Sequence, residues 1–258
     1  MTIGFFDSGI GGVTVLAEAL KQMPEEDYIY YADTKHVPYG EKSKEEVRRY
    51  ILDAADAVAS RGVKALVVAC NTATSIAVRE LRDHYSFPVI GMEPAVKPAV
   101  RLSANREKRV LVFATSLTLK ETKFKQLVSA VDPNHIVDSI ALPGLVEFAE
   151  RLVFDGNKVE QYLADKLSGF DLSLYGTVVL GCTHFPFFRR TLRKLLPPDI
   201  DLIDGAGGTV KHLRNTLQAE GRLGGGRSAV TFMTSGDGEA AEPVFRQAMT
   251  FAMENLND

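Results

Sequence analysis

The sequence has no tryptophan and only two cysteines, Cys70 and Cys182, among its 258 residues. A chain of this length with 45% hydrophobic residues can bury a core without disulfides, so the cysteines are not needed as cross-links. Neither a C-x-x-C nor an H-E-x-x-H motif is present, and a metal site would have to be assembled from scattered residues. We therefore predict no metal centre, which leaves catalysis or core packing to explain the two thiols.

A dominant charge of one sign and long apolar runs are also missing. The 30 basic and 33 acidic residues are scattered and give a net charge of −3, without the basic stripe that a nucleic-acid partner requires. No apolar run approaches the roughly 20 residues that cross a bilayer. The apolar segment 3–6 begins at once, without a charged leader. We expect a cytoplasmic protein that binds neither nucleic acid nor membrane.

Short apolar runs rich in β-branched residues alternate with longer segments of helical periodicity. This alternation is typical of an α/β fold with mostly parallel sheets. One helix is expected directly after Gly12, and another after a capping box at Ser43-Lys44-Glu45-Glu46. The predicted strands are 3–6, 28–31, 65–69, 88–91, 109–114, 136–141, 177–180, 200–203 and 230–233.

A weak internal similarity suggests two related halves. Segments 65–72 and 177–184 each place a cysteine just past a buried strand. In parallel sheets ligands bind at the carboxyl ends of the strands, so the two cysteines could face each other across a cleft. We predict two similar doubly wound domains, 1–94 plus 206–258 and 95–205, with the active site in the cleft between them.

The opening Asp7-Ser8-Gly9-Ile10-Gly11-Gly12 is similar to a phosphate-binding turn. It lacks the Gly-Lys-Ser/Thr ending of a P-loop, and Thr14 stands where G-x-G-x-x-G needs its last glycine. A nucleotide site is therefore not expected. The segment does place an acid at the end of a strand, where Asp7 could either serve a ligand or simply cap the following helix.

The neighbours of the cysteines favour chemistry over packing. A lone free cysteine is more often a core residue, but Asn71 and Thr72 follow Cys70, and Thr183 and His184 follow Cys182. We expect the free N–H groups of the next helix to favour a thiolate at each site. His184 could be a proton partner of Cys182 or a structural, hydrogen-bonded histidine.

Taken together, these motifs resemble those of the glutamate racemase family, within the aspartate/glutamate racemase superfamily, nearly from end to end. The resemblance implies that Cys70 and Cys182 are the catalytic cysteines, with Cys70 acting on the D-enantiomer. It also implies that Asp7, Glu147 and His184 support proton transfer. The motifs are Phe6-Asp7-Ser8-Gly9-Ile10-Gly11-Gly12, Tyr31-Ala32-Asp33, Val37-Pro38-Tyr39-Gly40, Ala69-Cys70-Asn71-Thr72-Ala73, Gly181-Cys182-Thr183-His184-Phe185-Pro186 and Thr234-Ser235-Gly236-Asp237.

The same comparison implies a set of residues that contact glutamate and a role in supplying D-glutamate for peptidoglycan. It also implies a homodimer. The expected contacts are Asp7, Ser8, Tyr39, Gly40, Asn71, Thr72, Thr183 and His184.

The expected reaction is a two-base racemisation, in which one cysteine removes the α proton and the other returns a proton to the opposite face. Because the two thiols account for both transfers, no pyridoxal phosphate or other cofactor is expected. Three alternatives remain at this point: racemisation of aspartate or hydantoins, a decarboxylase relative that needs one cysteine, and a binding protein without turnover.

Overall fold

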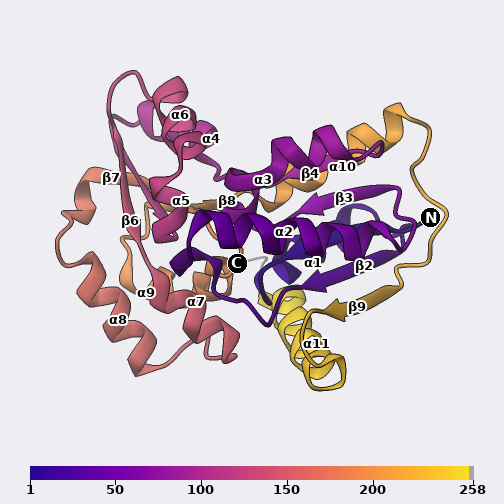
Figure 1. The fold of residues 1–258 in the computed structure, drawn as a ribbon. Helices are drawn as coiled ribbons and strands as arrows, with labels where there is room; N and C mark the ends of the chain where they lie inside the picture. The colour runs from indigo at the N-terminus through magenta and orange to yellow at the C-terminus, as the bar shows by residue number, and fades with distance from the viewer. Residues whose placement is uncertain (256–258) are drawn as a thin grey trace.

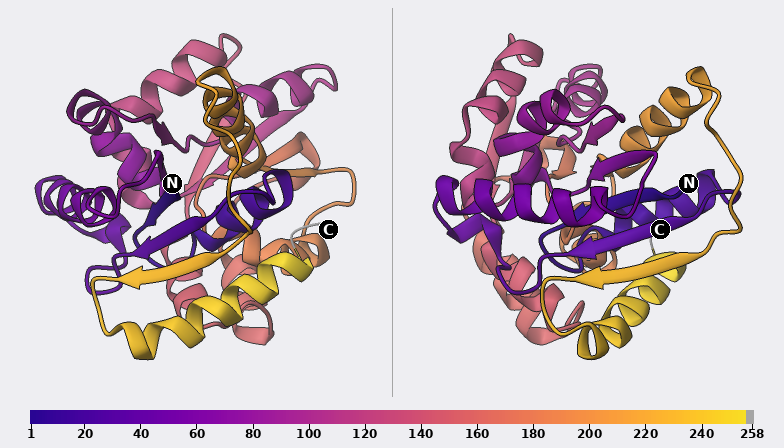
Figure 2. Two further views of the ribbon diagram at one scale, coloured as in Figure 1. Left: turned by 90° about the vertical axis from the view of Figure 1, so that its right-hand side faces the viewer. Right: turned by 45° about the vertical axis from the view of Figure 1, so that its right-hand side comes forward.

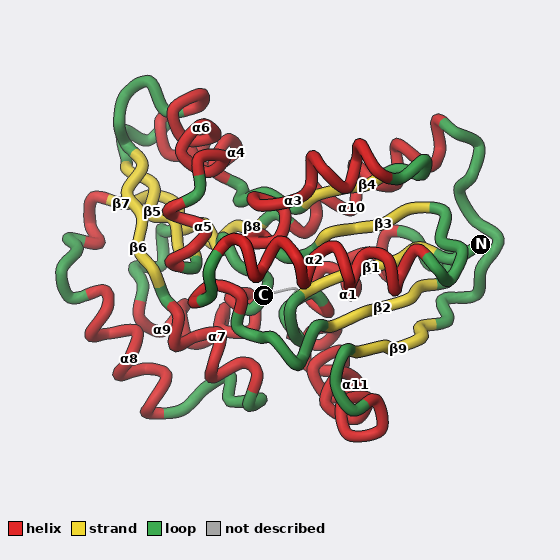
Figure 3. The backbone as a smooth tube through the Cα atoms, viewed as in Figure 1, coloured by secondary structure: helices red, strands yellow, loops and turns green. Residues whose placement is uncertain are grey.

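The computed structural model describes residues 1–255 and contains two separate parallel sheets (Figures 1 and 3). The first has the order β4-β3-β1-β2-β9 and the second the order β6-β5-β7-β8, and every paired strand is parallel. The predicted α/β class and all nine predicted strands are confirmed. The strands are β1 (Ile3–Asp7), β2 (Tyr28–Ala32), β3 (Ala65–Val68), β4 (Val89–Gly91), β5 (Arg109–Ala114), β6 (Val137–Ala141), β7 (Tyr175–Leu180), β8 (Asp201–Asp204) and β9 (Val230–Thr234).

Helices connect the strands and cover the sheets. The capping box is present: the Ser43 side chain accepts a hydrogen bond from the Glu46 N–H, and the Glu46 carboxylate accepts one from the Ser43 N–H. The helices are α1 (Val13–Gln22), α2 (Lys44–Ala59), α3 (Asn71–His84), α4 (Val96–Ala104), α5 (Ser116–Lys120), α6 (Thr122–Val131), α7 (Pro143–Glu150), α8 (Asn157–Leu167), α9 (Arg189–Leu195), α10 (Ala206–Ala219) and α11 (Gly238–Asn255), with short 3-10 turns η1 (Tyr39–Glu41), η2 (Leu172–Leu174) and η3 (Phe185–Phe188).

The first sheet is buried on both faces. Successive side chains of a strand point to opposite faces, so Phe5 packs in the same apolar cluster as the residues of α1, whereas Phe6 packs with the buried stripe of α2. Strands β1, β2 and β3 are therefore apolar almost throughout, as expected for parallel strands covered on both sides.

The chain builds the two sheets in turn and then returns to the first. It leaves the first sheet after β4, completes the second sheet with β5 to β8, and comes back through α10, which packs against α1. Strand β9 then adds to the edge of the first sheet beside β2, with α11 running alongside it (Figure 2). No helix among residues 1–255 is both long and apolar enough to cross a bilayer.

Candidate active site

Each cysteine stands just beyond the carboxyl end of a central strand, one in each sheet. Cys70 follows β3 and caps α3, where its sulfur accepts a hydrogen bond from the Ala73 N–H at 3.4 Å. Cys182 follows β7. Both line one cavity of about 20 Å³, which is room for roughly one water molecule. The two sheets therefore bring the predicted pair of thiols to a single narrow site.

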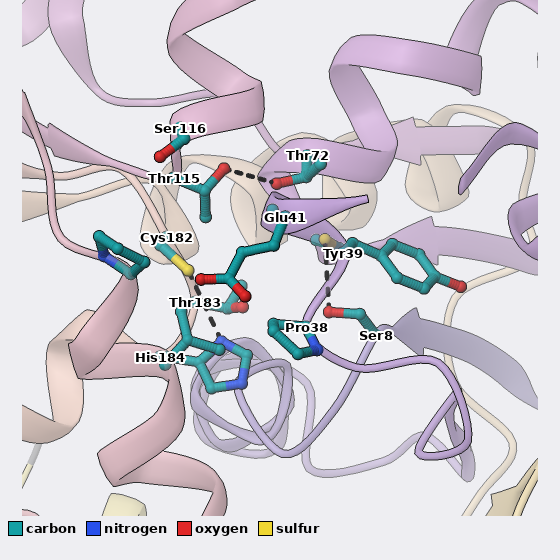
Figure 4. Close-up of a pocket in the computed structure, with 14 residues that line it drawn as sticks. Ser8, Pro38, Tyr39, Glu41, Thr72, Thr115, Ser116, Cys182, Thr183 and His184 are labelled. Atoms are coloured by element: carbon teal, nitrogen blue, oxygen red, sulfur yellow. Dashed lines mark hydrogen bonds between the residues drawn. The ribbon is translucent and has the colours of Figure 1, made fainter. Parts of the chain in front are cut away.

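Most of the predicted substrate contacts line this cavity, and Figure 4 shows the Cys182 side chain across from Ser8 and Tyr39. Asp7 does not line the cavity, but it accepts hydrogen bonds from two residues that do, Ser8 and Thr183. Asn71 instead lines a neighbouring cavity of about 280 Å³, and both polar atoms of its side chain are buried without a hydrogen-bond partner. The predicted residues that line the cysteine cavity are Ser8, Tyr39, Gly40, Thr72, Thr183 and His184.

An acid and a hydroxyl stand beside Cys70. The Ser8 hydroxyl is 3.8 Å from the Cys70 sulfur and 3.4 Å from Asp7 Oδ1. Asp7 is fully buried, and it accepts hydrogen bonds from the Gly9 N–H and from the Thr183 hydroxyl, both at 3.0 Å. Burial raises the pKa of Asp7, although the nearby His184 lowers it.

The protonation of Cys70 differs from the expectation based on its helix. Burial raises the pKa of the Cys70 thiol, and the charge of Asp7 raises it further. The hydrogen bonds from the Ala73 N–H and from Ser8 oppose this rise but do not overcome it. In this structure, therefore, Cys70 is a thiol at neutral pH, which suits a proton donor.

On the other side, Cys182, His184 and Glu150 form a chain of contacts. The Cys182 sulfur is 3.6 Å from His184 Nδ1, and His184 Nε2 is 2.6 Å from Glu150 Oε1. Burial alone would lower the pKa of His184, but its hydrogen bonds to Cys182 and Glu150 outweigh burial and raise the pKa well above its usual value. A protonated His184 places an N–H beside the sulfur and another beside the carboxylate.

The family resemblance places Glu147 among the residues that support proton transfer, but in this structure a different acid contacts His184. Glu147 lies on the exposed face of α7, whereas Glu150, at the end of the same helix, contacts both His184 and the Ile10 N–H. The buried face of α7 carries Leu145, Val146 and Ala149, and this face directs position 150 toward the site. The expectation for Glu147 rested on the family resemblance, and Glu150 was not among the residues that the resemblance implied.

Several lining residues had not been selected from the sequence. Thr115 follows β5 as Cys70 follows β3, so the rule that sites form at the carboxyl ends of parallel strands could have found it. The others come from turns and helix starts and carried no such signal. The additional lining residues are Pro38, Glu41, Thr115, Ser116, Pro143 and Val146.

Comparison with known proteins agrees with this geometry. Residues 10–213 match the family model described as Asp/Glu/Hydantoin racemase, and the chain therefore belongs to that family.

Within the family, similar curated relatives include glutamate racemases. The chain is 57% identical to "Glutamate racemase 2" of Bacillus subtilis over 236 residues, which is 92% of this chain and 89% of the relative. It is 58% identical to a glutamate racemase of Halothermothrix orenii over 238 residues, covering 92% and 93% of the two chains. A solved glutamate racemase from Francisella tularensis in complex with D-glutamate has a TM-score of 0.83 at 28% identity and covers 96% and 93%.

Proposed function

We propose that this protein interconverts L- and D-glutamate without a cofactor, using Cys70 and Cys182 as the two bases. The observation that carries the proposal is the convergence of both cysteines, one from each sheet, on one small cavity lined by hydroxyl groups. The chain's similarity to glutamate racemases, one of them solved with D-glutamate, supports glutamate as the substrate.

The different surroundings of the two sulfurs suggest which cysteine is the base and which is the proton donor in the resting form. The α C–H of an amino acid is a very weak acid, so it needs a strong base on one face and a proton donor on the other. In the resting form we assign the thiolate to Cys182, stabilised by the His184 imidazolium, and the thiol to Cys70. If Cys70 acts on the D-enantiomer, as the family resemblance implies, this form is ready to deprotonate L-glutamate. Reversing the two protonation states prepares the enzyme for D-glutamate.

Hydroxyl groups from both sheets would hold the substrate and its developing negative charge. The Thr72 hydroxyl is 3.0 Å from that of Thr115 and 3.1 Å from that of Thr118, so residues on either side of the cavity meet there. Thr183 also lines the cavity, but its hydroxyl donates to Asp7 at 3.0 Å in this structure, so it would have to turn to donate to the substrate. Such preoriented donors are worth more in a closed site, from which water is excluded.

Substrate entry would require the site to open. About 20 Å³ cannot hold glutamate, so we propose that the parts formed by residues 1–94 plus 206–258 and by residues 95–205 move apart to admit it.

The resemblance to the glutamate racemase family supports three further proposals. The enzyme would act in the cytoplasm, form a homodimer and supply D-glutamate for peptidoglycan.

Exchange of the α proton with solvent tests the proposed activity. The protein is incubated with L-glutamate in deuterated water, and the product is analysed by mass spectrometry and on a chiral column. We expect deuterium at the α carbon together with D-glutamate. A parallel incubation with L-aspartate should show at least about a hundredfold less exchange. Preferred exchange of aspartate would point to a different racemase, and no exchange with either would point to a binding protein.

A further inference from the structure

Asp33 is a buried acid that does not line the cysteine cavity. Asp33 follows β2 and is only 2% exposed. The oxygen Oδ2 accepts a hydrogen bond from the Tyr39 hydroxyl at 2.6 Å, and Oδ1 accepts one from the Ser235 hydroxyl at 2.5 Å. The Nδ1 atom of His36 is 2.8 Å and 3.0 Å from the two oxygens. One carboxylate thus connects the segment 33–39 to the turn after β9.

The contact with Tyr39 explains the direction of its side chain. Tyr39 lies in the cavity wall, but its ring points away from Cys182, with the hydroxyl at the far end (Figure 4). Burial raises the pKa of Tyr39, and the neighbouring Asp33 charge and hydrogen bond raise it further. Tyr39 therefore remains a neutral hydrogen-bond donor to Asp33 at all physiological pH values.

Gly40, the residue after Tyr39, forms part of the cavity wall next to the other sheet. Gly40 lines the cavity, and a Cβ atom there would lie 2.8 Å from the Cβ of Thr115, which follows a strand of the other sheet. This approach is too close for any residue with a side chain. A small displacement of Tyr39 would therefore change both the cavity wall and its contact across the cleft.

Ser235 ties the same acid to the C-terminal strand. Its hydroxyl also accepts a hydrogen bond from the Lys35 N–H at 3.1 Å, and next to it the hydroxyls of Thr34 and Thr234 are 2.5 Å apart. The Ser235 N–H donates to the Ala32 carbonyl at 3.2 Å. These contacts give a structural role to the turn after β9, which the sequence had marked only as a motif.

We propose that Asp33 is a positioning residue for the reaction, which acts through Tyr39 to fix the Tyr39–Gly40 wall against the substrate, with Ser235 holding Asp33 in place. The inference depends on the proposed racemase function. A buried carboxylate suits this task because its hydrogen bonds are charge-assisted and stronger than those between neutral groups. Asp33 does not line the cavity, so its effect on the substrate must pass through the wall.

Kinetics of matched variants test this role. Tyr39→Phe removes one hydroxyl, Asp33→Asn removes the charge, and Ser235→Ala removes a contact on the far side of Asp33. We expect KM for both enantiomers to rise about tenfold in Tyr39→Phe and Asp33→Asn, and less in Ser235→Ala. KM of the double variant Asp33→Asn/Tyr39→Phe should not exceed KM of the more strongly impaired single variant, because both changes break the same contact. Tyr50→Phe, which removes the hydroxyl of a tyrosine whose ring centroid lies 6.3 Å from that of Tyr39, should behave like the wild type.

A purely structural role would reduce the amount of folded enzyme, and hence kcat, without changing KM. Unchanged KM in both Tyr39→Phe and Asp33→Asn would overturn the inference. So would increases in KM that multiply in the double variant. If Asp33→Asn does not fold, Tyr39→Phe and Ser235→Ala still decide it. Absence of racemisation by the wild-type protein in the same assay would instead reject the proposed function.

Discussion

The carboxylate of Asp7 accepts a hydrogen bond from the hydroxyl of Thr183 at 3.0 Å. Asp7 ends a strand of the first sheet beside Cys70, and Thr183 directly follows Cys182 after a strand of the second. The bond therefore joins the two halves of the site behind the cavity. An acid at this position raises the pKa of Cys70 and is bonded to the residue that follows Cys182, so it links the surroundings of the two cysteines.

Asp7→Asn should stabilise the protein while reducing its activity. Burial raises the pKa of Asp7 above the unfolded value, so the folded protein favours the protonated acid and ionised Asp7 costs stability at neutral pH. We expect the variant to have a higher Tm than the wild type at pH 7. The difference should shrink as the pH falls toward the ordinary carboxyl pKa of about 4. Racemisation should fall by about a hundredfold.

Thermal unfolding at several pH values, combined with the racemisation assay, checks this prediction. A lower Tm for Asp7→Asn at pH 7 would show that the ionised carboxylate stabilises the fold through its hydrogen bonds more than burial penalises it.

Replacing Glu150 and Glu147 separately distinguishes the two acids of α7. Glu150→Gln removes the charge from the carboxylate that contacts His184, so kcat should fall between about tenfold and a hundredfold. Glu147→Gln, a matched change on the exposed face of the same helix, should stay within about twofold of the wild type. Equal losses in both variants would mean that the contact of Glu150 with His184 is not what matters.

The pH dependence of racemisation should report the protonation of His184. Because the folded-state pKa of His184 is raised, its proton is retained at neutral pH and lost only as the pH rises through that higher value. Activity from L-glutamate should therefore persist well above pH 6.5 and then decline. Glu150→Gln removes one cause of the raised pKa and should move the decline to lower pH. Coincident pH profiles of wild type and variant would exclude Glu150 as the cause.

Much of the fold could be predicted from the sequence, because buried parallel strands are short apolar runs and the helix signals were local. Ser43 and Glu46 formed their capping box as expected, and Cys70 and Cys182 followed their strands. What could not be predicted depends on contacts between distant segments. Asp33 is 202 residues away from Ser235 in the chain, and Glu150 is 140 away from Ile10. No local pattern encodes which acid of a helix meets a given histidine, or that burial outweighs a helix N-terminus at Cys70.

A buried ion pair away from the site should matter for stability. The ammonium of Lys64 is 2.6 Å from Glu26, and the two side chains are only 4% and 1% exposed. Lys64 also donates to the carbonyls of Arg222 and Gly224. Lys64→Met leaves the Glu26 charge buried without a cation and should lower the free energy of unfolding by about 3 kcal/mol.

Chemical denaturation measures this loss. The exposed pair of Arg246 and Glu242 gives a control, since Arg246→Met should change stability by less than about 0.5 kcal/mol. A similar small effect for Lys64→Met would indicate that Glu26 takes up a proton or reaches water when its partner is removed.

Racemisation by Cys70→Ala and Cys182→Ala tests the two-cysteine mechanism. Each variant is incubated with L-glutamate and, separately, with D-glutamate, and formation of the opposite enantiomer is followed by circular dichroism, with folding checked by thermal unfolding. Both variants should fold and should lose racemisation in both directions by at least about a thousandfold, because each direction needs one sulfur as base and the other as acid. Turnover near the wild-type rate in either folded variant would contradict the two-cysteine mechanism.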